Sequence, residues 1–286
     1  MKLIDGNKIA RAILKELTDK LALIERRKPC LAFILVGNDP ASEAYIRVKT
    51  RGCLETGIQS KTFKLPHLIS EERLLSHIEQ LNLDETVDGV IVQHPLPKQI
   101  SQLRVIESIS PDKDVDGFHP INLGKLLMGQ DRRFTACTPL GVMHMLKHCA
   151  IELSGKHVVI VGRSNIVGKP LAALLVQKKM GANATVTIAN SKTKNLKMLC
   201  TLADVLVVAI GHPHFIKSDM IKEGCIVIDV GINRLGKKLV GDVDFETVKE
   251  KAGAITPVPG GVGPMTVAML LSNTYLSYQR KFSALV

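Results

Sequence analysis

Short apolar segments alternate with helix-like segments along most of the chain. Residues 30–37 and 87–93 are nearly continuous apolar runs, as expected of strands that are covered on both faces of a sheet. After the first run, Asp39-Pro40 offers a helix cap with a first-turn proline, and Gly57 offers a helix end. The complete pattern places further strands at 59–65, 157–162, 184–189, 204–210 and 225–230, and helices at 41–56, 70–82, 140–150, 168–179 and 264–280. Because parallel strands are joined by crossover helices, the pattern predicts an α/β protein with parallel sheets.

The segment 110–138 departs from this alternation because it is rich in Pro, Gly, Asp and Asn. That composition is typical of an ordered loop, and we expect it to cross between two domains. The predicted fold class is therefore α/β, with two α/β domains and a cleft between them. The first domain is expected to comprise residues 1–138 plus 265–286, because the final helix can pack back on it. Residues 139–264 have the compact layout of a Rossmann-like dinucleotide-binding domain.

The chain is strongly basic, and its charge needs an explanation. The 38 Lys and Arg against 27 Asp and Glu give a net charge of +11, which suits nucleic acid, anionic membranes or polyanionic small molecules. Aromatic residues make up only 3% and Trp is absent, so few side chains could stack on single-stranded bases. The basic residues also occur in short pairs rather than in a long run. We therefore predict no nucleic-acid partner.

Three further features bear on compartment and on metals. The N-terminus lacks the apolar core of a signal peptide, and no apolar run approaches the roughly 20 residues of a membrane span. The six cysteines have neither CxxC nor zinc-ligand spacing, and are typical of small buried side chains in a reducing compartment. These features predict a cytoplasmic protein with no membrane partner and no metal site.

A glycine-rich turn follows the strand expected at 157–162. It reads Gly162-Arg163-Ser164-Asn165-Ile166-Val167-Gly168-Lys169-Pro170. Between a strand and a helix, such a turn can present backbone N–H groups to a pyrophosphate. The spacing differs from GxGxxG because the glycines are six residues apart with none between them. A tight turn with no ligand is therefore the alternative.

The loop at 190–194 bears on which dinucleotide would bind. An NAD site usually carries an acidic residue at this point to hold the ribose hydroxyls. Here the chain has Asn190-Ser191-Lys192-Thr193-Lys194, with hydroxyl and basic groups and no acid. Together with Arg163, this composition favours the 2′-phosphate of NADP, and a solvated basic loop is the alternative.

Tyr45, Lys49 and Gln93 are candidates for chemistry in the first domain. Tyr45 and Lys49 are four residues apart in an expected helix and therefore share a face. A partly buried lysine has its ammonium form disfavoured and can exchange protons near neutral pH, although a lone lysine on a helix is more often solvent-exposed. Gln93 ends a buried strand, where open α/β sheets bind ligands. An amide that only holds the following loop is the alternative.

Asp112, Asp114 and Asp116 form an alternating acidic pattern. The twelve-residue pattern of a calcium loop is not completed by a Glu at the required place. A carboxylate can instead accept two N–H donors from the edge of an amino-pyrimidinone ring. Each acid could equally serve as a capping or turn residue.

Considered together, these segments resemble one family, the bifunctional methylenetetrahydrofolate dehydrogenase/methenyltetrahydrofolate cyclohydrolases. The resemblance covers nearly the whole chain, and several long motifs occur in the family's order. They are Ala41–Lys49 (ASEAYIRVK), Asp88–Gln93 (DGVIVQ), Pro111–Phe118 (PDKDVDGF), Cys137–Pro139 (CTP), Gly162–Pro170, Asp229–Asn233 (DVGIN) and Pro257–Thr266 (PVPGGVGPMT). The resemblance implies that residues 1–138 plus 265–286 form a folate-binding catalytic domain and residues 139–264 an NADP-binding domain.

The resemblance also implies roles for individual residues. Lys49 would be the acid/base group of the cyclohydrolase step, and Gln93 would hydrogen-bond Lys49 and help to set its protonation. Tyr45 would lie against the aromatic ring of the folate, Asp116 would hold the edge of the pterin, and the loop 259–267 would close over the folate. Further substrate contacts are implied for Val92, His94, Pro259, Gly260 and Gly263. Cofactor contacts are implied for Gly162, Arg163, Ser164, Ser191 and Ile232.

The implied activity is bifunctional. The enzyme would oxidise 5,10-methylenetetrahydrofolate to 5,10-methenyltetrahydrofolate with NADP, and then hydrolyse this product to 10-formyltetrahydrofolate. Both ligands are anions, so the net charge of +11 is interpreted as suiting small anionic ligands rather than nucleic acid. A single-activity NAD-dependent methylenetetrahydrofolate dehydrogenase and a non-catalytic folate- or nucleotide-binding protein are the alternatives. A homodimer is also expected from the resemblance.

Two residues depart from the family's pattern. His94 stands where leucine is usual after the glutamine, and would either place a titratable ring beside the pterin or point outward. Asn190 stands where histidine is common before Ser191, which weakens the transfer of a 2′-phosphate contact to that serine. Neither departure touches the residues implied in catalysis.

Overall fold

The computed structural model describes residues 1–130, 134–236 and 238–283, and these divide into two compact units. Among the described residues, unit 1 comprises 1–11, 126–129, 138–236 and 238–266, and unit 2 comprises 12–125, 130, 134–137 and 267–283. Residues 1–11, expected in the first domain, instead belong to unit 1. The reason is that Lys2–Leu3 adds a strand to its sheet by pairing with Ala254–Ile255.

Helices and strands alternate along most of the described chain, and the main sheet of each unit is parallel, which confirms the predicted α/β class. The strands are β1 (Lys2–Leu3), β2 (Cys30–Val36), β3 (Gln59–Leu65), β4 (Gly89–Val92), β5 (His157–Val161), β6 (Thr185–Ala189), β7 (Val205–Val208), β8 (Ile226–Asp229), β9 (Asn233–Leu235), β10 (Lys238–Val240) and β11 (Ala254–Ile255). The helices are α1 (Gly6–Ala22), α2 (Pro40–Thr56), α3 (Glu71–Leu83), α4 (Gln102–Ser108), α5 (Pro120–Leu127), α6 (Cys137–His148), α7 (Gly168–Leu175), α8 (Leu196–Thr201), α9 (Phe245–Val248) and α10 (Val262–Ser283), with a 3₁₀ turn at Ser218–Met220.

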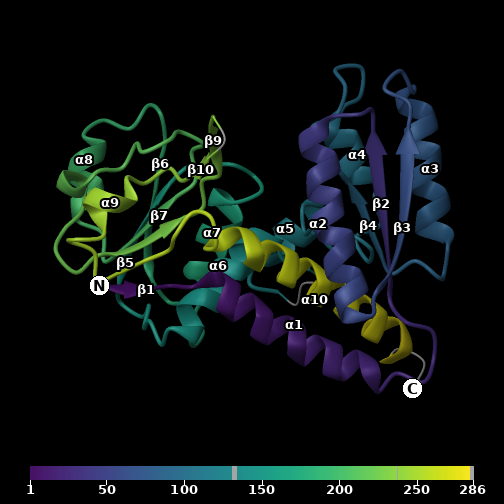
Figure 1. Ribbon diagram of the computed structural model, residues 1–286, viewed down its shortest axis with the longest axis horizontal. Coiled ribbons are helices and arrows are strands. Elements are labelled where there is room, and N and C mark those ends of the chain that lie inside the picture. The colour runs from purple at the N-terminus through teal and green to yellow at the C-terminus, as the bar shows by residue number, and fades with distance from the viewer. Residues whose placement is uncertain (131–133, 237, 284–286) are drawn as a thin grey trace. The chain divides into compact units, whose positions relative to one another are not determined.

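Unit 2 is built on a three-stranded parallel sheet in the order β3-β2-β4. Figure 1 shows α2, α3 and α4 around this sheet. The central strand β2 is buried along its whole length, as its continuous apolar sequence predicts. Alternate β2 side chains pack with Leu74 and Ile78 of α3 and with Val105 of α4 to form one core. The chain crosses from β3 to β4 over β2, so the strand order reverses beside the carboxyl end of β2.

The helices that carry the site in unit 2 are fixed by local sequence and by packing. α2 begins after Asp39, whose carboxylate accepts the Ser42 N–H at 2.7 Å, and ends at Gly57 in the left-handed conformation. Both ends lie where the sequence predicts them. The middle of α10 packs against α2, since a Cβ at Gly52 would lie 3.1 Å from Leu271 Cδ1. Residues 267–283 of this helix belong to unit 2, whereas residues 262–266 belong to unit 1, although 265 and 266 were expected in the first domain.

Unit 1 contains a six-stranded sheet in the order β1-β11-β8-β7-β5-β6, with every pairing parallel. β6 lies on one side of β5 and β7 on the other, so the strand order reverses between β5 and β7. Ligands of open α/β sheets bind outside the carboxyl ends of the strands at such a reversal. The glycine-rich turn follows β5 directly and therefore lies at this point of unit 1.

The structure also contains elements that the sequence pattern did not reveal. The segment 110–138, predicted to be a loop, contains α5 in its described part. Pro120 occupies the first helical position and Leu126 is buried, as is usual in a helix. Gly124 lies within the helix, and because glycine disfavours helices, the sequence did not indicate one here. The helix α1 was missed as well. The strands β1 and β11 have two residues each, which is too short to show a periodic signal.

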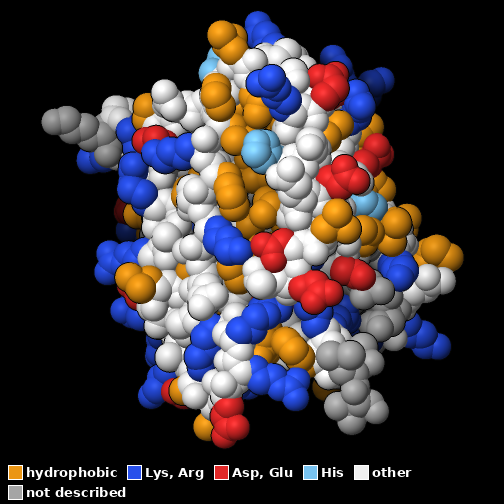
Figure 2. Space-filling view, turned by 90° about the vertical axis from the view of Figure 1, so that its right-hand side faces the viewer, with side chains coloured by type: hydrophobic (Ala, Val, Ile, Leu, Met, Phe, Trp, Pro, Cys, Tyr) orange, Lys and Arg blue, Asp and Glu red, His pale blue; other side chains and the backbone are white. Residues whose placement is uncertain are grey.

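Charged side chains of both signs share the face shown in Figure 2. Lys and Arg form several separate groups there, with Asp and Glu among them. The basic excess on this face is therefore divided between groups and does not form one continuous surface. Among the described residues, no helix combines the length and the apolar character that crossing a membrane requires.

Candidate functional site

Lys49 and Gln93 come together at the carboxyl end of β4 in unit 2. Lys49 lies on α2, and its Nζ donates a hydrogen bond to Gln93 Oε1 at 3.1 Å. Gln93 Nε2 donates to the His94 carbonyl oxygen at 2.9 Å, and the Ser42 hydroxyl donates to the same oxygen at 3.2 Å. These contacts fix which end of the Gln93 amide faces Lys49. The hydrogen bond that the resemblance implies is therefore present.

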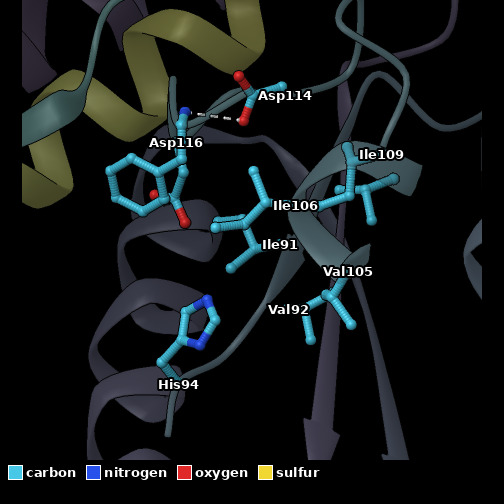
Figure 3. Close-up of a pocket in the computed structure, with 10 residues that line it drawn as sticks. Ile91, Val92, His94, Val105, Ile106, Ile109, Asp114 and Asp116 are labelled. Carbon is cyan, nitrogen blue, oxygen red and sulfur yellow. Dashed lines mark hydrogen bonds between the residues drawn. The ribbon is translucent and has the colours of Figure 1, made fainter. Parts of the chain in front are cut away.

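Asp116, His94 and Val92 line one small pocket of unit 2, where the His94 ring and the Asp116 carboxylate face the same space (Figure 3). The other lining residues are Val90, Ile91, Val105, Ile106, Ile109, Asp114 and Phe118. Burial lowers the pKa of His94, while the charge of Asp116 opposes this shift and the charge of Lys49 adds to it. Of the two orientations that the sequence left open for His94, the structure has the one that faces the pocket.

Asp114 is buried beside this pocket and shapes the loop that carries Asp116. Its Oδ1 accepts the Phe118 N–H at 3.1 Å, the dashed line in Figure 3. Its Oδ2 accepts the His119 N–H at 2.8 Å and the Asn122 amide at 2.9 Å. Burial raises the pKa of Asp114 to about 6, and these hydrogen bonds limit the shift. Asp114 thus has the role of a turn residue, and Asp116 lies within the loop that it closes.

Tyr45 lies one helical turn before Lys49 on α2, and its side chain is 50% exposed. Lys49 itself is half-buried. Residues four apart on a helix lie on the same face, and an exposed aromatic ring offers an apolar surface to a planar ligand. The geometry is compatible with the implied folate contact of Tyr45, which stays a prediction.

The glycine-rich turn of unit 1 brings backbone segments unusually close together. Gly162 has a φ of 130°, and a Cβ there would lie 2.3 Å from the Ala209 carbonyl oxygen. A Cβ at Gly168 would lie 2.2 Å from the Gly162 carbonyl oxygen. Arg163 and Ser164, between these glycines, are exposed. This turn has a glycine at each end and lies where the strand order of the sheet reverses. Such a turn fits the pyrophosphate of a dinucleotide.

Asn190 organises the loop that follows β6. Its Oδ1 accepts the Lys192 N–H at 3.0 Å, and its own N–H donates to Thr193 Oγ1 at 2.8 Å. Asparagine in this position therefore acts as a turn-forming residue. Ser191, Lys192 and Lys194 are exposed, so one hydroxyl and two ammonium groups are available to an anion such as a 2′-phosphate.

Ile232 follows β8 and is 46% exposed. It lies beside the start of α10, since a Cβ added at Gly263 would lie 3.4 Å from Ile232 Cδ1. Gly260 has a φ of 101°, and its carbonyl oxygen accepts the Asn7 N–H at 3.1 Å, while Pro259 is exposed. These residues thus belong to the unit that carries the glycine-rich turn. Their contacts with folate and cofactor stay predictions.

Two buried acids of unit 1, Asp229 and Asp242, were overlooked in the sequence. Asp229 lies within the DVGIN motif, and Asp242 begins an Asp-Val-Asp alternation like that at 114–116. The repeated alternation was the available signal. Across residues 1–130, 134–236 and 238–283, no group of three or more His, Cys, Asp or Glu is arranged to hold a metal ion.

Comparison with known families matches both parts of the chain. The catalytic domain of tetrahydrofolate dehydrogenase/cyclohydrolase matches residues 4–116, and the NAD(P)-binding domain of the same enzymes matches residues 136–282. The chain belongs to the tetrahydrofolate dehydrogenase/cyclohydrolase family. The family predicted from the sequence motifs is thereby confirmed.

Individual relatives agree with this chain over its whole length. The bifunctional protein FolD of Protochlamydia amoebophila is 52% identical over 285 residues, which cover 97% of this chain and 98% of the relative. The solved structure of the bifunctional enzyme FolD from Campylobacter jejuni has a TM-score of 0.95 at 49% identity and covers 98% of this chain and 99% of that one. FolD of Trypanosoma brucei, solved with NADP and an inhibitor, has a TM-score of 0.93 at 37% identity and covers 98% of both chains.

Proposed function

We propose that this chain is a bifunctional, NADP-dependent methylenetetrahydrofolate dehydrogenase and methenyltetrahydrofolate cyclohydrolase. The observation that carries the proposal is the 3.1 Å hydrogen bond between Lys49 Nζ and Gln93 Oε1. It holds the Lys49 amine in place in the same unit as the pocket lined by Asp116. Membership of the family and the fit of the Gly162 turn to a dinucleotide support the dehydrogenase activity.

The dehydrogenase step needs little covalent help from the protein. The methylene carbon of the substrate is flanked by two nitrogens, so loss of a hydride leaves a resonance-stabilised methenyl cation. When bound, NADP supplies the hydride acceptor. The residues of unit 2 then have an orienting task, in which Asp116 accepts N–H donors of the pterin edge and Tyr45 supports the aromatic ring.

The cyclohydrolase step needs proton transfer. Water adds to the methenyl carbon, and the added oxygen loses both of its protons as the formyl C=O bond forms, one to the ring nitrogen and one to solvent. Lys49 Nζ is assigned the transfer of one of these protons to the ring nitrogen, as the bond between that nitrogen and the carbon breaks. Gln93 Oε1 accepts one hydrogen of Lys49 Nζ and so fixes the position of this group. Positioned proton transfer of this kind contributes about 10²–10⁴-fold to the rate.

The NADP site is assigned to the carboxyl ends of the strands of unit 1. Gly162, Arg163 and Ser164 are proposed to surround the pyrophosphate, Ser191 to contact the 2′-phosphate, and Ile232 to pack against the dinucleotide. The loop 190–194 contains no acid, which favours NADP over NAD because a carboxylate there would repel the 2′-phosphate.

The two activities are tested separately on the unmodified protein. With 5,10-methylenetetrahydrofolate, we expect NADPH to form and kcat/KM to be higher with NADP than with NAD. With the methenyl compound alone, we expect hydrolysis without any dinucleotide. No NADPH above background from folded protein would refute the dehydrogenase, and equal kcat/KM with NAD would refute the assignment of the 2′-phosphate.

The protein is further proposed to act in the cytoplasm as a homodimer, without a nucleic-acid or membrane partner. The family resemblance supports the dimer, and the low aromatic content argues against single-strand binding. Sedimentation equilibrium tests the dimer. Titration with duplex and single-stranded DNA tests the partner class, because nucleic-acid binding would weaken steeply as salt is raised.

A further inference from the structure

The two buried acids of unit 1, Asp229 and Asp242, take no part in the chemistry above. Asp229 ends β8, and Asp242 lies two residues after β10. Their side chains are excluded from solvent, with exposures of 3% and 0%. A buried carboxylate is costly unless hydrogen bonds compensate it, so the donors around each acid show what it holds in place.

Four donors from two segments hold the Asp242 carboxylate. Its Oδ2 accepts the N–H groups of Ile210 at 2.7 Å and Gly211 at 3.0 Å. Its Oδ1 accepts the His212 N–H and the Asn233 Nδ2, each at 2.8 Å. Three consecutive backbone N–H groups after β7 therefore converge on one carboxylate, which is the arrangement of an anion-binding nest.

Asp229 fixes the segment that carries Asp242. Its Oδ1 accepts the N–H groups of Asp242 and Gly231, each at 3.0 Å, and its Oδ2 accepts the Val243 N–H at 2.9 Å. Its own N–H donates to Thr256 Oγ1 at 2.8 Å. The two acids thus form one network, in which the first acid holds the backbone of the second.

Two glycines allow the carboxylates to approach the backbone. A Cβ at Gly231 would lie 2.2 Å from Asp242 Cγ, and a Cβ at Gly241 would lie 1.8 Å from Asp229 Oδ2. Each carboxyl group therefore packs directly on the backbone beside the other acid. This packing leaves no room for a side chain at either glycine and holds the network in one arrangement.

The network borders the proposed dinucleotide site on two sides. Ala209, whose carbonyl oxygen faces Gly162, immediately precedes the three N–H groups of the nest. Ile232 lies between Gly231, which packs on the nested carboxylate, and Asn233, which donates to it. One carboxylate therefore joins the segment after β7 to the segment after β8, and each segment adjoins a residue assigned to the dinucleotide.

We infer that Asp242, supported by Asp229, is a positioning residue for the dinucleotide, which it orients by joining the Ala209–His212 and Gly231–Asn233 segments. This inference rests on the proposed function, because it requires a dinucleotide at this edge of the sheet. A carboxylate suits the position because its two oxygens accept all four hydrogen bonds and present no donor. An asparagine would place an NH₂ group against at least one backbone N–H.

The test is Asp242→Asn in the full chain, with Asp219→Asn as the matched control. Asp219 belongs to the same unit and forms an exposed ion pair with Lys197, so its substitution makes the same chemical change away from the network. We expect Asp242→Asn to weaken NADP binding in calorimetry by roughly tenfold or more, since a buried donor loses its acceptor. The control should bind NADP with the affinity of the unmodified protein.

Two readouts distinguish positioning from a general loss of structure. Amide hydrogen exchange of the protein without cofactor should be faster at residues 210–212 in Asp242→Asn and unchanged in β2 of unit 2. Hydrolysis of the methenyl compound without dinucleotide should stay within about twofold of the unmodified rate, because the positioning acts on the dinucleotide alone.

A milder variant covers the case in which Asp242→Asn does not fold. Asn233→Ala removes one of the four donors from a half-buried position, and should weaken NADP binding about threefold. Unchanged NADP affinity in either folded variant would overturn the inference. Failure of the proposed function has a different signature, because the unmodified protein would then bind no NADP at all.

Discussion

Replacing Gly162 by alanine should separate the two activities of the enzyme. The new Cβ would lie 2.3 Å from the Ala209 carbonyl oxygen, whereas ordinary contacts of a Cβ begin at 3.4 Å. The turn must therefore move by about 1 Å away from the end of β7, and at a φ of 130° the alanine backbone is strained as well. A misplacement of about 1 Å costs about 10²-fold where geometry is critical, which corresponds to about 3 kcal/mol of binding free energy.

The assay is the affinity for NADP, measured by calorimetry beside the rate of methenyl hydrolysis. We expect NADP binding to weaken about 10²-fold, while hydrolysis stays unchanged because Lys49 and Gln93 lie in unit 2. Gly181→Ala is the matched control, since Gly181 belongs to the same unit, has a φ of 76° and has open space where a Cβ would lie. If Gly162→Ala bound NADP as tightly as Gly181→Ala, the turn would be a tight turn with no ligand.

Two further predictions concern one acid, Asp114, and the histidine, His94, of the pocket in unit 2. The pKa of Asp114 is raised from 3.8 to about 6 in the folded protein, so its contribution to stability is fully present below the unfolded pKa and is lost as pH rises through the folded one. Asp114→Asn removes this titration, and the stability of the variant relative to the unmodified protein should rise by about 3 kcal/mol from about pH 4 to pH 7. The free energy of unfolding of both proteins is measured in urea at each pH, with hydrogen exchange of the β2 amides as the probe. A stability difference that is constant with pH would contradict the raised pKa of Asp114. For His94, whose pKa burial lowers from 6.5, protonation would repel the methenyl cation and attract Asp116. The kcat/KM of hydrolysis should therefore fall as pH drops through that pKa, and His94→Leu should lack this acid limb. Identical pH profiles of both proteins would exclude His94 from the substrate site.

Much of the fold was predictable because its strands and caps carry strong local signals. The apolar runs at 30–37 and 157–162 and the Asp39-Pro40 cap all correspond to the elements observed. The errors fall where the signal is weak or non-local. The helix α5 contains a glycine, and β1 exists only because it pairs with β11, more than two hundred residues later in the chain. No local pattern could therefore place residues 1–11 in unit 1.

The candidate site shows a similar division. Gln93 could be named as a candidate because it ends a buried strand, where open α/β sheets bind ligands. Its hydrogen bond to Lys49 was expected from the family resemblance and not from helix spacing. The sequence could not show that His94 faces the pocket, since this depends on how the chain turns after β4. The network of Asp229 and Asp242 was also beyond reach, because its donors come from three separate segments.

One chain carries two activities that depend on separate residues, and the Lys49→Met variant should separate them. The variant removes the proton-exchanging amine but leaves the Gly162 turn intact. In a single preparation, we expect NADPH formation to persist while methenyl hydrolysis falls by about 10²–10⁴-fold. Lys61→Met is the control, because Lys61 forms a surface ion pair with Asp84 in the same unit. Full hydrolysis by folded Lys49→Met would rule out the role of Lys49, and an equal loss of both activities would show that the two activities do not depend on separate residues.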